Sequence, residues 1–197
     1  MDPFLASYVA LWIVVVAQGL MLIVVLRQFG EMYLSSRAGI SRDGLNIGDA
    51  APRFEGVRSG GSAVRLNELL GRWVVLIFAS TGCSICRELL PSLAPIERDL
   101  QDAVSIHVLL RASPDEAEAY VEGTHTDADV IAIGREGVAE QYKVRVSPFA
   151  HILDPEGVVR AKGLVNDREG VEHLLSDAGM KHLALEKHLP VVAGAHG

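Results

Sequence analysis

The residues best suited to chemistry in this sequence are its two cysteines, Cys83 and Cys86, which are separated by Ser84 and Ile85. Two thiols at this spacing lie one helical turn apart, close enough to alternate between a dithiol and a disulfide. The C-x-x-C pair therefore predicts thiol–disulfide exchange, in which one cysteine attacks a client sulfur and the other releases the mixed disulfide.

The pair is expected at the junction of a strand and a helix. An unbroken apolar run over 73–78 precedes it, and apolar residues recur with helical spacing over 85–100. A helix N-terminus carries a partial positive charge and unpaired N–H groups, which favour a thiolate on the first cysteine. Cys83 is therefore predicted to be the exposed nucleophile and Cys86 the resolving cysteine.

Composition limits the other kinds of site. Two cysteines are too few for a disulfide-stapled scaffold or for a zinc site made of thiolates alone. A net charge of −7, from 18 basic and 25 acidic residues, argues against binding to nucleic acid. Two alternatives remain open: both cysteines are core residues, or they belong to a non-catalytic binding module that holds a partner or copper through the cysteines and a histidine. His151 is the best placed histidine for this, although a lone histidine on a strand is more often a structural residue.

Short apolar runs alternate with helical patterns through the rest of the chain. The runs are continuous, which is typical of strands that are covered on both faces. Their order predicts an α/β fold with a central sheet flanked by helices. The predicted strands are 73–78, 104–110, 130–133, 150–153 and 158–162, and the predicted helices are 85–100, one opening at 114–116, 136–142 and 167–178.

The N-terminal segment is of a different kind. Residues 4–26 carry no charge and, as a helix, would extend about 34 Å, enough to cross the hydrocarbon core of a bilayer. No basic leader precedes this run, so we interpret it as a retained anchor in contact with lipid and not as a cleaved signal. The predicted organisation is a transmembrane anchor over 1–26, a juxtamembrane linker over 27–46, a globular domain over 47–179 and a tail over 180–197.

Together these features resemble the thioredoxin superfamily. The similarity covers a strand, the C-x-x-C pair, Pro91 five residues after the second cysteine, a Val-Ser-Pro segment at 146–148, and a turn at Gly157. It implies a thioredoxin-like fold with a central mixed sheet. It also implies that Pro148 follows a cis peptide bond and faces the disulfide. The cis form of a peptide bond has a low energetic cost only before proline. Ser147, Thr81 and Gly82 would then border the groove that receives the substrate.

A finer similarity is to the MauD family of the membrane-anchored branch. It rests on the Gly-x-x-x-Pro-x-Phe segment at 48–54, on the uncleaved span that ends at 26–28, and on the block at 83–91. It implies a periplasmic domain that forms or isomerises disulfides in the cysteine-rich small (beta) subunit of methylamine dehydrogenase. The redox-active disulfide Cys83–Cys86 would be served by a membrane redox partner, and neither a metal nor a further cofactor is expected.

Several points stay open from the residues alone. The tryptophan common before the first cysteine is replaced by Thr81-Gly82, so oxidant, isomerase and reductant are not distinguished. Ile77 occupies the position at which thioredoxin has a buried acidic residue. Glu88 lies on the predicted helix and is interpreted as a surface residue. A peroxiredoxin-type peroxidase is a further alternative, for which Ser80 fits the motif but Leu76 occupies the proline position.

Two observations give opposite orientations for the predicted transmembrane span. Arg27, Arg37 and Arg42 follow it and no basic residue precedes it, so the positive-inside rule favours a cytoplasmic domain. The family resemblance implies the opposite side of the membrane.

Overall fold

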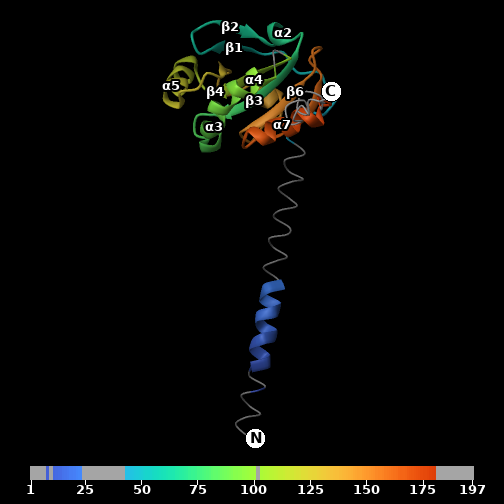
Figure 1. The fold of residues 1–197 in the computed structure, drawn as a ribbon. Coiled ribbons are helices and arrows are strands. Elements are labelled where there is room, and N and C mark those ends of the chain that lie inside the picture. Colours follow the sequence, from blue (N-terminus) through green and yellow to red (C-terminus); the bar gives the residue numbers. More distant parts are fainter. Residues whose placement is uncertain (1–7, 9–10, 24–42, 101–102, 181–197) are drawn as a thin grey trace, which may run out of the picture. The chain divides into compact units, whose positions relative to one another are not determined.

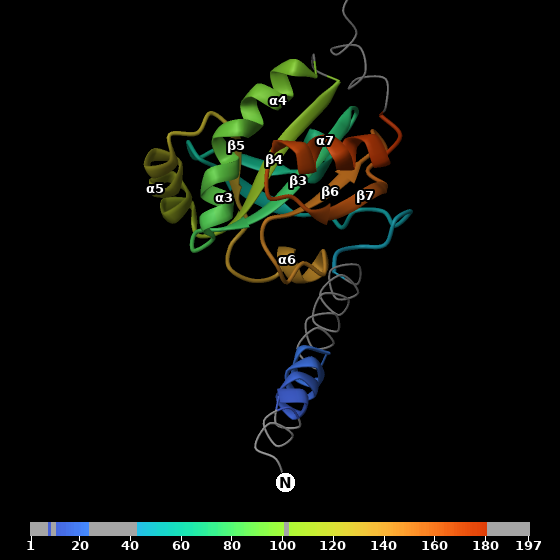
Figure 2. The same cartoon turned by 60° about the horizontal axis from the view of Figure 1, so that its bottom comes forward.

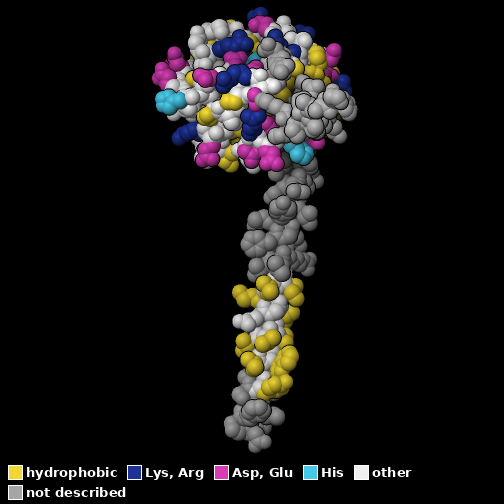
Figure 3. Space-filling view, in the orientation of Figure 1, with side chains coloured by type: hydrophobic (Ala, Val, Ile, Leu, Met, Phe, Trp, Pro, Cys, Tyr) yellow, Lys and Arg dark blue, Asp and Glu magenta, His cyan; other side chains and the backbone are white. Residues whose placement is uncertain are grey.

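The computed structural model describes residues 8, 11–23, 43–100 and 103–180, and the chain divides into two units, Met1–Arg42 and Asp43–Gly197 (Figure 1). In the first unit residues 11–23 are helical and their side chains are almost all apolar (Figure 3). Within the described part of the chain, no helix combines the length and the apolar character needed to cross a membrane. The rest of the predicted anchor, most of the predicted linker and the tail from residue 181 lie outside the described residues.

The second unit is built on a seven-stranded mixed sheet with the order β2-β1-β5-β4-β3-β6-β7. The strand that leads to the cysteines, β3, is central: β4 pairs with it in parallel and β6 pairs with it antiparallel. The predicted strands are all present, as β3 (Trp73–Ser80), β4 (Val104–Arg111), β5 (Asp129–Ala132), β6 (Phe149–Leu153) and β7 (Val159–Leu164).

The predicted helix over 85–100 is divided in the structure. It consists of α3 (Ser84–Leu89), the 3-10 turn η1 (Leu90–Ser92) and α4 (Leu93–Asp99). Pro91 lies within η1, and a proline interrupts a helix because it has no N–H to donate and its ring clashes with the preceding turn. The remaining helices are α5 (Pro114–Thr124), α6 (Val138–Gln141) and α7 (Arg168–Asp177).

Helices α3, α4 and α7 lie on one face of the sheet (Figure 2). The connections from β3 to β4 and from β4 to β5 are crossovers between parallel strands, which are right-handed in nearly all proteins, so α3 and α4 share this face with α5. The core beneath them contains Val75 and Ile77 of β3, Cys86 of α3, and Val171 and Leu175 of α7. This packing holds the start of α3 at the C-terminal end of β3.

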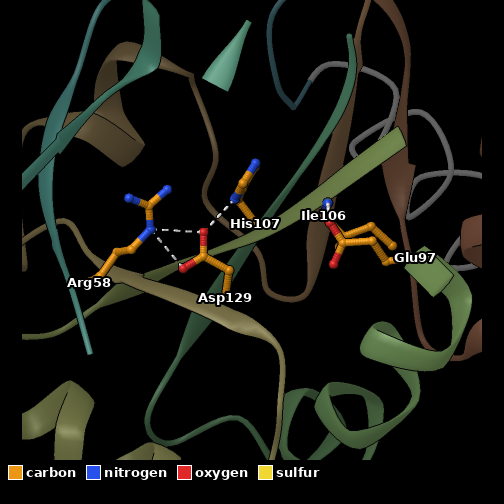
Figure 4. A network of polar contacts seen from close by, with 5 residues as sticks. All are labelled: Arg58, Glu97, Ile106, His107 and Asp129. Carbon is orange, nitrogen blue, oxygen red and sulfur yellow. Dashed lines mark hydrogen bonds and ion pairs between the residues drawn. The ribbon is translucent and has the colours of Figure 1, made fainter. Parts of the chain in front are cut away.

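The opposite face carries a polar network that no sequence pattern indicated (Figure 4). Nδ1 of His107 lies 2.7 Å from the Asp129 carboxylate, and Nε of Arg58 donates to the same carboxylate at 3.0 Å. Burial alone would raise the pKa of Asp129, but the hydrogen bonds from His107 and Arg58 outweigh burial and lower it. The network joins three neighbouring strands, and Glu97 separately ties α4 to β4 by accepting from the Ile106 N–H at 3.2 Å.

Two parts of the fold were not predicted. The edge hairpin of β1 (Glu55–Arg58) and β2 (Ala63–Arg65), followed by α2 (Leu66–Leu69), was missed because its strands are short and mostly polar. The second unit also begins at Asp43, four residues before the predicted boundary at 47. Asp43 and Leu45 are buried by contacts with residues about a hundred positions later in the chain, which a local pattern does not reveal.

Candidate redox site

Cys83 and Cys86 form a disulfide at the N-terminus of α3, with their Cα atoms 5.3 Å apart. Cys83 is the N-cap residue and has an extended backbone, whereas Cys86 lies inside the first turn of the helix. Cys86 is fully buried in the core and Cys83 is only partly buried. The two sulfurs therefore differ in access, and a thiolate arriving from solvent reaches Cys83 first.

The backbone at the start of α3 prepares Cys83 to carry negative charge. The N–H of Cys86 donates to Sγ of Cys83 at 3.1 Å, which is the capping interaction of the helix. When the disulfide is reduced, the same N–H stabilises a thiolate on Cys83, because unpaired N–H groups at a helix start favour an anion. This arrangement makes Cys83 both a good nucleophile and a good leaving group.

The loop before β6 lies beside Cys83. The Ser147–Pro148 peptide bond is cis, and the carbonyl oxygen of Ser147 is 3.7 Å from Sγ of Cys83. Pro148 is buried and Ser147 is partly exposed, so the backbone next to the proline borders the accessible sulfur. A hydrogen bond from the N–H of Val165 to the carbonyl oxygen of Pro148 fixes the far end of the loop.

The remaining predicted groove residues form an open rim. Thr81 and Gly82 precede Cys83 and are exposed, and Ser84 is exposed on the first turn of α3. A Cβ atom added at Gly82 would meet no heavy atom within 4 Å. Ile85 exposes 42% of its surface, which is unusual for a large apolar side chain in this unit. A client chain therefore has space to approach the disulfide. The exposed apolar side chain of Ile85, between the two cysteines, is available to contact it.

His151 is a buried structural histidine and does not lie on the side of the sheet that faces the cysteines, so the alternative in which it helps them hold copper is wrong. Side chains alternate along a strand, and Ala150 and Ile152 face the core that contains Cys86. His151 faces the other side of the sheet, where its ring packs against Phe78 and Tyr142. Among the residues that the structure describes, no group of three or more His, Cys, Asp or Glu side chains is arranged to hold a metal ion.

The interior next to the disulfide is apolar at the position where thioredoxin has an acid. Ile77 is fully buried in the core that contains Cys86. Glu88 is exposed on α3, in accord with its interpretation as a surface residue. The side chain of Ile77 therefore cannot take part in proton transfer during exchange.

Known proteins are similar to this chain in sequence and in fold. A model of the AhpC/TSA family matches residues 47–162. The methylamine utilization protein MauD of Methylorubrum extorquens is 33% identical over 180 residues, which cover 89% of this chain and 86% of that protein. MauD of Paracoccus denitrificans is 29% identical over 195 residues, covering 96% of each chain. The thioredoxin domain of thiol-disulfide oxidoreductase BVU-2223 from Bacteroides vulgatus superposes with a TM-score of 0.58 at 26% identity, over 66% of this chain and 97% of that one.

Proposed function

We infer that this chain, which belongs to the AhpC/TSA family and to the MauD proteins, exchanges disulfides with a cysteine-containing client through Cys83 and Cys86. One observation carries this inference. The accessible sulfur of the Cys83–Cys86 disulfide lies 3.7 Å from the backbone carbonyl that precedes a cis proline. This places the atom that reacts beside a stretch of backbone able to hold an extended client segment.

The exchange needs no group beyond the two cysteines. A client thiolate attacks Sγ of Cys83, the Cys83–Cys86 bond breaks, and Cys86 leaves as a thiolate that takes a proton from solvent. A second client thiolate then attacks the client sulfur of the mixed disulfide and releases Cys83. The client loses two electrons and gains a disulfide, and the cysteine pair gains the same two electrons. Run in reverse, the steps reduce a client disulfide, and run in both directions they isomerise one.

We propose that the client is the small subunit of methylamine dehydrogenase. The relatives are named for methylamine utilization, and a protein subunit with many cysteines needs an enzyme that forms or corrects its disulfides. A membrane redox partner would return the Cys83–Cys86 pair to its working state after each cycle.

We further propose that residues 4–26 hold the protein in the membrane with its globular unit in the periplasm. The uncharged length of this segment supports an anchor. Disulfides persist outside the cytoplasm, which supports the periplasmic side for an enzyme that makes them. The arginines at 27, 37 and 42 favour the other orientation, so a reporter fused after residue 197 is the direct test.

The activity is tested with the purified full-length chain in detergent. The oxidised protein is mixed with reduced, unfolded ribonuclease A, and the loss of free thiols is followed with time. We expect thiols to disappear with wild-type protein and to persist with Cys83→Ser. Mixed instead with ribonuclease A that contains scrambled disulfides, Cys86→Ser should accumulate a mixed disulfide, because the Cys83 thiolate breaks a client disulfide, stays bonded to one of its sulfurs and releases the other as a thiolate. Consumption of hydrogen peroxide in place of exchange would contradict the proposal and identify a peroxidase.

A further inference from the structure

The second unit begins with a buried segment that contacts the cis-proline loop. We call residues Asp43–Leu45 the N-terminal strap, and residues 143–148, which lie between α6 and β6, the cis-proline loop. Asp43 is 4% exposed and Leu45 is 5% exposed, although both directly follow the stretch predicted to be a linker. The strap is therefore part of the folded unit.

On one side of Pro148 the strap holds the loop through two contacts. The N–H of Gly44 donates to the carbonyl oxygen of Lys143 at 2.9 Å. The guanidinium of Arg145 reaches Oδ1 of Asp43 with both Nε and Nη2, each at 2.7 Å. Breaking this pair leaves a carboxylate whose side chain is 6% exposed and whose nearby positive charge is reduced to that of Lys162, which is costly for a buried group.

On the other side of Pro148 the strap is held by β6 and β7. The N–H of Leu45 donates to Nε2 of His151 at 3.1 Å in a buried position. Nζ of Lys162, the residue paired with His151 across the two strands, donates to the carbonyl oxygen of Asp43 at 2.8 Å. The strap thus contacts the chain three residues before Pro148 and three residues after it.

The fit between the strap and His151 is close and leaves little freedom. Gly44 has a φ of +76°, and a Cβ atom at this position would lie 2.7 Å from Nε2 of His151 and 2.7 Å from a ring carbon of Phe149. The His151 ring is enclosed by Phe78, Tyr142 and Phe149, with ring centroids 5.2 to 5.7 Å away. Burial lowers the pKa of His151 to about 3, and the charge of Lys162 adds to this effect. The ring stays neutral and keeps Nε2 available to accept the Leu45 N–H.

We propose that the N-terminal strap sets the position of the cis-proline loop against Cys83, and that Arg145 and His151 are positioning residues for exchange with a protein client. This inference rests on the proposed function. The loop has no helix or strand of its own between α6 and β6, so contacts with neighbouring segments decide where the Ser147 carbonyl lies. Loosening the strap displaces the backbone that aligns a client next to the Cys83 sulfur.

The test compares a protein substrate with a small thiol, using the full-length chain. Reduced, unfolded ribonuclease A needs the cis-proline loop for alignment, whereas dithiothreitol does not. We expect Arg145→Ala and His151→Phe to lower the second-order rate constant for ribonuclease A about tenfold, which is less than the roughly hundredfold that a misplacement of about 1 Å can cost. The rate constant with dithiothreitol should stay within about twofold of wild type. His151→Gln, which restores an acceptor, should recover most of the lost rate.

Arg160→Ala is the matched control. Arg160 lies 2.7 Å from Asp154, whose side chain is 5% exposed, compared with 6% for Asp43. The Arg160–Asp154 pair lies in the β6–β7 hairpin at the end away from Pro148. Arg160→Ala should leave the rates with ribonuclease A and with dithiothreitol unchanged, because this variant removes a similar ion pair without touching the strap.

The outcomes separate the two proposals. Equal slowing with both thiols, or no slowing of the ribonuclease reaction in Arg145→Ala, would overturn the strap inference. Arg145 has a side chain that is 75% exposed, so its replacement keeps the test valid if His151→Phe does not fold. A wild-type disulfide that reacts with neither thiol would overturn the proposed function, and the strap inference would fall with it.

Discussion

At the scale of single residues, the main feature of the site is that its two bonded sulfurs differ in their exposure to solvent. Cys83 caps α3 and is partly exposed, whereas Cys86 is fully buried one turn later. The types and spacing of these residues were sufficient to predict the chemistry. The sequence could not indicate the environment of His151, because the aromatic rings around it come from three separate segments.

His151 should make the stability of the protein depend on pH. Burial lowers its pKa in the folded state to about 3, while in the unfolded chain it is near the ordinary value of about 6.5. Between these values the unfolded chain binds a proton that the folded protein does not, so stability falls as the pH falls below about 6.5. The slope from this one group approaches about 1.4 kcal/mol per pH unit.

Urea denaturation of the full-length chain at a series of pH values measures this effect. His151→Gln should flatten the dependence between pH 6.5 and 4, whereas His173→Gln, at an exposed position of α7, should leave it as in wild type. If the free energy of unfolding of His151→Gln depends on pH as steeply as that of wild type, the account of the burial of His151 is contradicted.

At the scale of elements, the sheet brings the site together because β3 is held on both sides by strands that are remote in sequence. β4 aligns with it in parallel and β6 in the antiparallel sense. The β6 pairing places the Ser147–Pro148 bond at the same end of the sheet as the start of α3, since Phe149 of β6 lies opposite Phe78 of β3. The disulfide and the cis proline therefore meet through strand register.

The edge hairpin offers a test of this architecture. A Cβ atom at Gly56 of β1 would overlap a methyl carbon of Ile131 and lie 2.8 Å from the carbonyl oxygen of Ala132. Gly56→Val should therefore push β1 away from β5 and lower the free energy of unfolding by about 1–3 kcal/mol, as overpacking does. Urea denaturation of the full chain measures the loss. Gly82→Ala, which meets open space, is the control and should change the free energy of unfolding much less.

The central elements were predictable and the edge elements were not, for a physical reason. Strands such as 73–80 are covered on both faces and so consist of continuous apolar residues, which mark them in the sequence. β1 and β2 lie at the sheet edge with several exposed positions, and their short polar pattern resembles a loop. The division of the helix is a local effect of Pro91 that the apolar spacing over 85–100 does not show. The contacts of the strap depend on tertiary packing, which periodicity does not record.

At the scale of the whole molecule, an uncharged N-terminal segment precedes a globular unit that carries the reactive disulfide. Attachment to a membrane, as proposed, would confine the enzyme to the surface where it could meet the proposed client and the proposed membrane redox partner. The match to MauD of Paracoccus denitrificans extends over 96% of the chain, so it includes most of the N-terminal unit.

Anchoring is tested by removing residues 1–26. The full-length chain should sediment with membranes and resist extraction by alkaline carbonate, because a span of about 20 apolar residues is held by the hydrocarbon core. The shortened chain should remain in the supernatant. Recovery of the full-length protein in the supernatant would contradict the proposed anchor without affecting the chemistry of the disulfide.

The most direct test of the central claim is to trap the client. Cys86→Ser is expressed at full length in cells that also produce the small subunit of methylamine dehydrogenase, and disulfide-linked complexes are separated without reductant. The variant should accumulate a covalent adduct with that subunit, because the Cys83 thiolate attacks a disulfide of the subunit, displaces one of its sulfurs as a thiolate and stays bonded to the other, and Cys86 is no longer present to resolve the mixed disulfide. The adduct should disappear on reduction and in Cys83→Ser/Cys86→Ser. If Cys86→Ser forms no adduct with any protein, or the adduct persists without Cys83, exchange through Cys83 is contradicted.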